Sequence, residues 1–277
     1  MCQGKYPLRV GGMPIRVVPR EQQRIFSSRP LGEGFLVCVG VIMTELLYLT
    51  DSYLREFEAT VIAVEGNGVV LGRTAFYPGG GGQPADRGAL MWEGGEAQVV
   101  KVKKQGDHVW HELDGDPPPV GTPVRGFLDW DHRYQLMRTH TALHILCGVI
   151  FRDYGALVTG GNMEPLKARM DFELEHMSTD FAQEVEGKIN AEVAASRLVR
   201  IYILPREEAF QIPDLIRTKI NLLPEGIQEV RIVEIEGLDM QADGGTHVAN
   251  TTEVGTIHVV GHESKGRINK RLRIALD

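Results

Sequence analysis

The sequence predicts an α+β fold in which a small β-barrel-like domain precedes a domain of mixed helices and strands. Two observations support this fold class. Between residues 43 and 129, short alternating or β-branched runs are separated by turns of glycine, asparagine and aspartate. Over residues 130–277, segments with helical periodicity then alternate with strand-like runs.

The composition is that of a globular protein. Of the 277 residues, 43% are hydrophobic and 24% are charged, which is enough for a substantial core. A net charge of −7 argues against a protein that coats nucleic acid over its whole surface, although it is compatible with a local basic patch. Cys2, Cys38 and Cys147 provide neither a disulfide framework nor a site of four thiolates. We therefore expect a protein of the reducing cytoplasm.

Residues 1–42 have a different character. They contain prolines, glycines and basic residues without a steady period, and their apolar run, Phe35–Ile42, is far too short to span a bilayer. They also lack the order of basic, apolar and cleavage regions that a signal peptide shows. A non-native or poorly ordered extension and a genuine first strand or arm are equally compatible with this segment. A more typical start follows at Met43.

The domain over residues 43–129 is predicted from four strand-like runs. Turns such as "EGNG" and "KKQGDH" separate these runs, and a small barrel is the natural closure for such strands. The proline-rich residues 115–124 indicate a boundary just before "RGFLDWDHR". The four runs are Ala59–Val64, Gly68–Leu71, Ala97–Val102 and His108–Leu113.

The domain over residues 130–277 is predicted to contain two helices and several strands. The period indicates helices at Arg133–Phe151 and at Thr179–Ser196, the second behind a cap at Ser178 or Thr179. The strands are expected at Lys167–Phe172, Val199–Leu204, Glu229–Ile235 and Thr256–His262.

Two motifs carry metal-binding chemistry. His140 and His144 are spaced i, i+4 on the first helix, which lets two imidazoles share one ion. In isolation, two partly buried histidines on the margin of an amphipathic helix would be the favoured interpretation. Asp243 and His247 enclose two glycines in "DGGTH", which by itself is equally compatible with an ordinary turn. Together the four side chains have the nitrogen and oxygen ligands that suit zinc, so the pair of motifs favours a site.

A second glycine cluster, Gly79, Gly80, Gly81 and Gly82, lies before Gln83 in "AFYPGGGGQPADRG". It lacks the Lys-Ser/Thr of a P-loop and the spacing of a dinucleotide-binding turn, so nucleotide hydrolysis is not supported. The flanking aromatic residues also argue against a flexible linker. We expect this backbone to approach a neighbouring element or the 3′ end of a ligand.

The motifs "AFYPGGGGQPADRG", "RTHTALHIL" and "MQADGGTHVANTTEVG", in this order, resemble those of the stand-alone alanyl-tRNA editing proteins called AlaX, which are similar to the editing domain of alanyl-tRNA synthetase. The resemblance covers Met43–Asp277 and is greatest to the intermediate-length type. It implies an aminoacyl-tRNA deacylase that hydrolyses the ester joining a wrong amino acid, chiefly serine and also glycine, to alanine tRNA.

The resemblance also implies a zinc site with His140, His144 and His247 as ligands. Asp243 departs from the usual Cys-Gly-Gly-x-His pattern and should hold zinc less firmly than a thiolate would. Four bound side chains would leave a tetrahedral ion no position for water, whereas three histidines with Asp243 free would leave one, so two mechanisms stay open. Thr159, in "LVTGGNM", resembles the family position that faces the serine hydroxyl, although an exposed turn threonine is the alternative.

Contact with tRNA is expected at the glycine cluster, at Gln83 and at a basic segment near the C-terminus. "KGRINKRLRI" and "KVKK" are basic runs on an acidic protein, although most such runs are solvated faces. The expected partner is alanine tRNA carrying a wrong amino acid, with no membrane or DNA partner. A non-catalytic metal-stabilised tRNA-binding module and a zinc-dependent hydrolase of a small ester or amide are the alternatives. The basic residues chosen for RNA contact are Lys265, Arg267 and Arg271.

Overall fold

The computed structural model describes residues 43–218, 223 and 226–277. The interpretation of residues 1–42 as an extension lies outside these described residues. The predicted α+β class, with a barrel followed by a mixed region, is confirmed. The division of the chain at residue 129 stays an interpretation.

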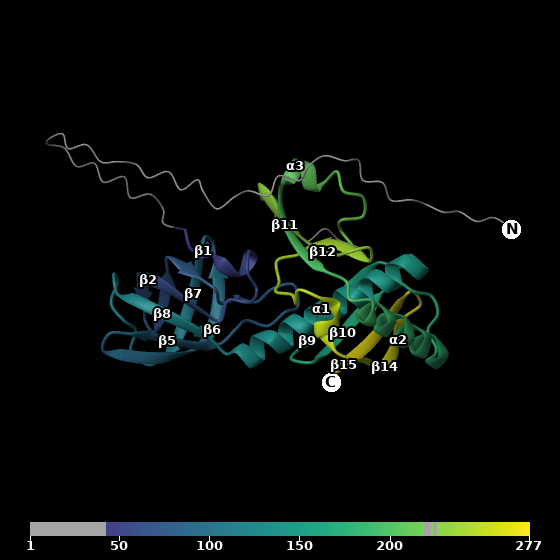
Figure 1. Ribbon diagram of the computed structural model, residues 1–277, viewed down its shortest axis with the longest axis horizontal. Coiled ribbons are helices and arrows are strands. Elements are labelled where there is room, and N and C mark those ends of the chain that lie inside the picture. The colour runs from purple at the N-terminus through teal and green to yellow at the C-terminus, as the bar shows by residue number, and fades with distance from the viewer. Residues whose placement is uncertain (1–42, 219–222, 224–225) are drawn as a thin grey trace. The chain divides into compact units, whose positions relative to one another are not determined.

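The first part is a closed antiparallel barrel (Figure 1). Strand alternation explains it: in β7, Val109, His111 and Leu113 point inward and are buried, while the residues between them face outward. A short parallel pair, β1 (Glu45–Leu46) with β4 (Arg73–Thr74), and the 3-10 helix η1 (Leu47–Leu49) accompany the barrel. In order around the barrel, its strands are β2 (Glu56–Glu65), β3 (Gly68–Leu71), β7 (His108–Asp114), β6 (Gly95–Gln105), β5 (Gly88–Trp92) and β8 (Pro123–Leu128).

The prediction of a boundary within residues 115–124 was wrong. Residues 115–122 form the loop between β7 and β8, and residues 123 and 124 already belong to β8. β8 is needed to close the barrel because it pairs with both β2 and β5. Pro123 could be accommodated because it is the first residue of its strand. The prolines therefore mark an internal turn of the barrel.

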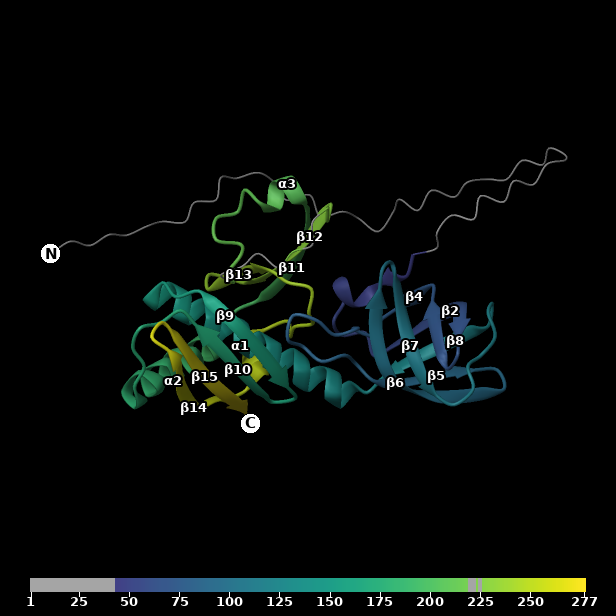
Figure 2. The ribbon, with the colours of Figure 1, turned by 180° about the vertical axis from the view of Figure 1, so that it is seen from behind.

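Two long helices and an antiparallel sheet form the second part (Figure 2). Helix α1 (Trp130–Tyr154) begins where the Asp129 carboxylate accepts a hydrogen bond from the His132 amide, and it ends at Gly155 in the left-handed conformation. Helix α2 (Thr179–Ala194) is capped by Ser178, as predicted. Both helices and the sheet contribute to one hydrophobic core. The sheet order is β14 (Ile257–Gly266), β15 (Asn269–Leu276), β10 (Lys167–Phe172) and β9 (Val158–Glu164).

A second sheet supports the turn that carries Asp243. It consists of β11 (Val199–Pro205), β12 (Glu229–Ile235) and β13 (Asp239–Ala242), with the short helix α3 (Arg206–Ala209) after β11. β13 ends one residue before Asp243, and the following turn leads into the 3-10 helix η2 (Thr251–Val254). The sheet therefore fixes the point from which the turn departs.

Most predicted elements are present with shifted ends, but β5 and β8 of the barrel and β9, β13 and β15 of the second part were not anticipated. β9 reads "VTGGNME", and its two glycines obscured the strand pattern; Thr159 lies on this strand, not in the turn that the alternative interpretation gave it. β15 alternates correctly, but its charged residues were interpreted only as a basic run. The pairing of both strands with β10 overrides these local signals.

A buried ion pair ties the glycine-rich segment to the start of α1. Arg133 is fully buried, and its guanidinium contacts the Asp86 carboxylate. It also donates to the backbone carbonyls of Ser52, at 2.9 Å, and Ala75, at 2.6 Å. Since Ala75 and Asp86 flank the glycine cluster, this one side chain fixes both ends of the cluster against the helix that bears the histidine pair.

Among the described residues, every helix is too short or too polar to cross a membrane.

Candidate metal centre

The four side chains predicted as metal ligands come together. His140 and His144 lie one turn apart on α1, and Asp243 and His247 come from the turn after β13. One ligand atom from each residue lies within 4.8 Å of all the others. The three imidazoles are buried, with ring centroids 4.3–5.2 Å apart. The chain has thus concentrated three nitrogen donors and one carboxylate in a space that fits a single ion.

The Nε2 atoms of the three histidines all face the Asp243 carboxylate. The distances are 2.9 Å from His247 to Oδ1, and 3.5 Å and 3.9 Å from His140 and His144 to Oδ2. Oδ1 also accepts a hydrogen bond from the Gly245 amide at 2.7 Å, which holds the carboxylate in this orientation. Oδ2 therefore remains the oxygen directed at the histidine pair.

The Nδ1 atoms of the same histidines are held by other groups. Nδ1 of His140 lies 2.9 Å from the Gln83 amide oxygen, and Nδ1 of His144 lies 3.0 Å from the Asp239 carboxylate. His247 approaches the Thr141 hydroxyl at 3.4 Å. Acceptors at Gln83 and Asp239 fix the proton on Nδ1, which leaves Nε2 with a free lone pair. This is the arrangement found in histidines that bind metals through Nε2.

Charge is distributed unequally within the cluster. Burial lowers the pKa of His140 to about 4, so this imidazole is neutral at pH 7. For His144, burial acts in the same direction but is outweighed by the carboxylates of Asp239 and Asp243, which raise its pKa to about 9. Burial opposes ionisation of Asp243, yet the surrounding histidines keep its pKa well below the usual range. At pH 7 the set therefore holds one carboxylate, neutral His140 and His247 and a protonated His144, so binding of a metal would release the His144 proton.

The donor set fits a divalent transition metal of the zinc type. Imidazole nitrogens and a carboxylate oxygen are common zinc ligands, and tetrahedral sites use four such groups. Arg231 lies beside this set, with Nη1 4.0 Å from Oδ1 of Asp243, so Oδ2 is the carboxylate oxygen that remains for an ion. The residues of the chain therefore support the metal site that the sequence predicts.

The glycine cluster forms a tight turn against β9. Gly80 and Gln83 exchange backbone hydrogen bonds at 2.9 and 3.1 Å. The four glycines have φ values from +57° to +138°, a region that other residues rarely adopt. A Cβ atom on Gly82 would lie 3.2 Å from the Gly161 carbonyl oxygen, so the close approach to β9 also requires glycine.

Gln83 has a direct structural connection to the centre. Besides its contact with His140, its side-chain oxygen accepts from the Thr246 amide at 3.1 Å and its nitrogen donates to the Thr246 hydroxyl at 2.9 Å. Gln83 is only 3% exposed. It thereby joins the glycine cluster, α1 and the turn of Asp243.

The other predicted site residues lie away from these contacts. Thr159 is exposed on β9, and its hydroxyl bonds to the Asn269 side chain at 3.0 Å. Arg271 makes a two-point contact with Asp171 at 2.6 and 2.7 Å, and Lys265 lies 3.4 Å from Glu263. Arg267 is exposed. Their roles toward a substrate stay predictions.

Sequence reasoning missed Asp239, although a signal was present. In "DMQAD", positions 239 and 241 share one face of β13, and Asp243 continues this alternation one residue past the end of the strand. Asp239 and Gln241 therefore point toward the same region as Asp243, and Gln241 donates to Asp239 at 2.6 Å. Gly148 on α1 permits this approach, since a Cβ there would lie 3.0 Å from the Asp239 Cβ.

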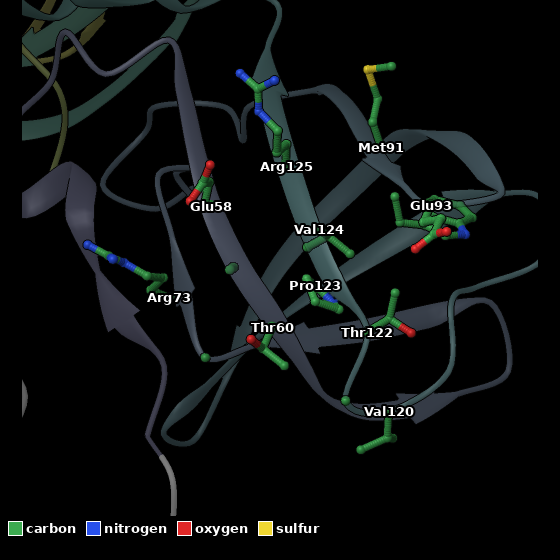
Figure 3. A pocket seen from close by; sticks show the side chains of 14 residues that line it. Glu58, Thr60, Arg73, Met91, Glu93, Val120, Thr122, Pro123, Val124 and Arg125 are labelled. Atoms are coloured by element: carbon green, nitrogen blue, oxygen red, sulfur yellow. The ribbon is translucent and has the colours of Figure 1, made fainter.

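A wide cleft lies elsewhere, on the barrel (Figure 3). Its volume is about 1130 Å³, and β2, β8 and the β5–β6 hairpin contribute most of its lining. Glu58, Arg73, Glu93 and Arg125 place charges of both signs around it. It shares no residue with the histidine centre, so its size does not make it the site of chemistry.

Known families match both parts of the chain. Residues 43–132 match "tRNA synthetases class II (A)", and residues 230–273 match "Threonyl and Alanyl tRNA synthetase second additional domain". The second match includes Asp243, His247 and the Asp239 that contacts His144.

Individual relatives cover nearly the whole described chain. It is 45% identical to the alanyl-tRNA editing protein AlaX-M of Saccharolobus solfataricus over 233 residues, which are 83% of this chain and 98% of that protein. The identity to AlaX-M of Methanosarcina barkeri is 42% over 241 residues, 84% of this chain and 99% of that protein. The alanine–tRNA ligase of Thermofilum pendens is 42% identical over 79% of this chain, but only 24% of the ligase is covered.

The barrel, the second-additional-domain match and the histidine centre define a protein of the class formed by the editing region of alanyl-tRNA synthetases. Within this class, the chain belongs to the AlaX-M family of alanyl-tRNA editing proteins. The resemblance inferred from three sequence motifs is thereby confirmed.

Proposed function

We propose that this protein is a trans-editing hydrolase that releases a wrong amino acid, chiefly serine and also glycine, from alanine tRNA. Membership in a family of editing proteins makes it an aminoacyl-tRNA deacylase. The observation that supports a hydrolytic site is the convergence of three histidine Nε2 atoms on the Asp243 carboxylate. The identities of the amino acid and of the metal belong to the proposal.

Zinc is the ion that we propose for the centre, with one ion per chain. His140, His144 and His247 would hold it through Nε2, because their Nδ1 atoms already face Gln83, Asp239 and Thr141. When bound, zinc supplies Lewis-acid chemistry that polarises an ester carbonyl or a water molecule. Asp243 would contribute Oδ2, because Gly245 already occupies Oδ1.

Asp243 has a second role open to it. A carboxylate held by a backbone amide and kept ionised can accept a proton from an attacking water. As a ligand it would complete the set of four, whereas as a base it would leave one position free for water or substrate. The two roles predict different metal affinities for variants at this position.

The glycine cluster is proposed to receive the 3′ end of the tRNA. The amides of Gly81 and Gly82 donate no hydrogen bond to other described residues, and both residues have positive φ. Consecutive free amides of this kind form a concave site for phosphate or hydroxyl oxygens. Gln83 at the end of the cluster connects this site to His140, at 2.9 Å.

Amino-acid selection and RNA contact are proposed at the end of the sheet where the Thr159 side chain of β9 reaches the Asn269 side chain of β15. Thr159 is proposed to hydrogen-bond the serine hydroxyl, and its own hydroxyl bonds to Asn269 next to the β14–β15 turn. Lys265, near the end of β14, and Arg267, in that turn, are exposed and are proposed to contact phosphates. Arg271 is proposed to contribute less, because Asp171 neutralises its charge.

The test is hydrolysis of alanine tRNA charged with serine, glycine or alanine by the zinc-loaded protein. We expect rapid release of serine and slow release of alanine, because a site that hydrogen-bonds the extra hydroxyl discriminates more strongly than one that relies on size. Equal release of serine and alanine would contradict editing. Tight tRNA binding without turnover would indicate a binding module, and turnover of free esters without RNA would indicate a small-substrate hydrolase.

A further inference from the structure

Arg217 lies between α3 and β12 in the sequence, but its side chain lies beside the metal centre. The side chain is only 12% exposed, and its guanidinium carbon lies 3.7 Å from the centroid of the Phe151 ring on α1. Its Nε atom lies 3.5 Å from Oδ1 of Asp239, which is fully buried. A cation from a separate segment thus faces the carboxylate that contacts His144.

The two oxygens of Asp239 have different surroundings. Oδ2 accepts hydrogen bonds from His144 Nδ1, at 3.0 Å, and from Gln241, at 2.6 Å. Oδ1 has no hydrogen-bond partner among the described residues, and Arg217 is the cation beside it. Arg217 therefore places a positive charge against Oδ1, the carboxylate oxygen that does not contact His144.

The backbone of Arg217 is attached to β9. The Val158 amide donates to the Arg217 carbonyl at 3.0 Å, and Val158 and Thr218 form a parallel bridge. The next residue of β9 is Thr159, the residue proposed to face the serine hydroxyl. Arg217 therefore contacts β9 through its backbone and the Asp239 carboxylate through its side chain.

We propose that Arg217 is a positioning residue that holds the Asp239 carboxylate in its orientation, so that His144 presents Nε2 to the metal. The proposal rests on the proposed function, in which His144 is a metal ligand. Arg217 does not touch the reacting atoms and acts through Asp239. The backbone beside Arg217 pairs with β9. A shift of Arg217 would therefore move both the strand that bears Thr159 and the carboxylate that contacts His144.

The contact is electrostatic rather than a specific hydrogen bond. Nε and Nη1 of Arg217 have no hydrogen-bond partner among the described residues, and the distance of 3.5 Å to Asp239 exceeds that of a good N–H···O bond. A lysine at this position would retain the charge but lose the planar contact with Phe151. A methionine would retain apolar packing on the ring and lose the charge, so the two substitutions separate charge from packing.

The experiment measures Co²⁺ binding by the full chain without RNA, because the visible absorption of Co²⁺ reports its ligand geometry. We expect Arg217→Met to weaken Co²⁺ binding roughly 10- to 100-fold, as for other residues that orient a ligand, and to alter the absorption band. Arg217→Lys should restore a large part of the affinity. Arg200→Met is the matched control, because Arg200 on β11 forms an exposed ion pair with Glu236. This variant should bind Co²⁺ like the parent.

A double-mutant cycle tests whether Arg217 acts through Asp239. On an Asp239→Asn background, Arg217→Met should change Co²⁺ affinity little, because the charge that it supports is already absent. Parent-like affinity and absorption in folded Arg217→Met, or full additivity with Asp239→Asn, would overturn the proposal. If circular dichroism shows that Arg217→Met does not fold, Arg217→Lys and Arg217→Gln replace it, and equal affinities for these two would have the same meaning. Absence of deacylation by the parent would bear only on the proposed function.

Discussion

Gly245 lies so close to the His140 imidazole that a Cβ atom at this position would be 2.3 Å from the ring. The turn and the helix can approach each other only because position 245 has no side chain. The neighbouring Gly244 is different, since a Cβ there would meet no atom within 4 Å. The two glycines of "DGGTH" therefore have separate roles, and they provide a matched pair for substitution.

We expect Gly245→Ala to abolish firm metal binding, because either the His140 ring or the Asp243 turn must move. Gly244→Ala should retain the metal. The measurement is the zinc that remains bound after graded exposure to a chelator. Comparable zinc retention in the two variants would show that the contact between Gly245 and His140 does not constrain the site.

Asp243 is expected to determine how firmly the metal is held. Exchange for Cys should tighten zinc binding, since thiolate suits this ion better than carboxylate, and exchange for Ala should loosen it. His140→Ala and His144→Ala should lose metal and activity together. Chelator titration and deacylation are measured on the same samples. An Asp243→Ala variant that keeps zinc as firmly as the parent but loses turnover would identify Asp243 as a base instead of a ligand.

Thr159→Val is expected to reduce the preference for serine over alanine more than it reduces the total rate. Valine has the shape of threonine but cannot hydrogen-bond a hydroxyl, so the site would discriminate mainly by size, which is worth about 1–3 kcal/mol. The ratio of kcat/KM values for serine- and alanine-charged tRNA is the measurement. An unchanged ratio would remove Thr159 from the amino-acid pocket.

Asp86→Asn is expected to lower the free energy of unfolding by about 3–5 kcal/mol, because it leaves the buried Arg133 without its counter-charge. The control is Glu56→Gln, which breaks the exposed pair with Arg125 and should change stability by no more than about 1 kcal/mol. Chemical denaturation of the two variants gives the comparison. Similar losses would show that the Arg133 pair does not stabilise the fold as its burial indicates.

His111 is expected to make the barrel sensitive to acid. It is fully buried, bonded to the Thr74 hydroxyl at 2.8 Å, and burial lowers its pKa from 6.5 to about 4. Between these pKa values His111 binds a proton in the unfolded chain but not in the folded chain. The free energy of unfolding therefore falls as the pH falls from about 6.5 to 4. The full loss is about 3 kcal/mol for this shift.

The measurement is the free energy of unfolding of the parent and of His111→Gln at several pH values. The variant should have a flatter profile between pH 6.5 and 4, whatever its stability at pH 7. The exposed His176 provides a control, and His176→Gln should retain the steeper profile of the parent. Parallel profiles for His111→Gln and the parent would contradict the assignment.

The sequence by itself determined the elements whose signals are local. The period of α1 and the spacing of His140 and His144 follow from 3.6 residues per turn, and the Ser178 cap follows from the chemistry of one helix end. The Asp-Gly-Gly-x-His turn was also recognisable, because its glycines and ligands are adjacent in the chain. Ordered motifs of this kind were sufficient to predict the family and the four side chains that come together in the candidate metal centre.

Only the tertiary structure decided which groups orient those ligands. Gln83, Asp239 and Arg217 reach the centre from three separate segments, and Asp239 is 95 residues from the His144 that it contacts. The same holds for β8, whose place in the barrel follows from pairing with two distant strands. Contacts of this range leave no periodic trace in the sequence, because each depends on how several packed elements approach one another.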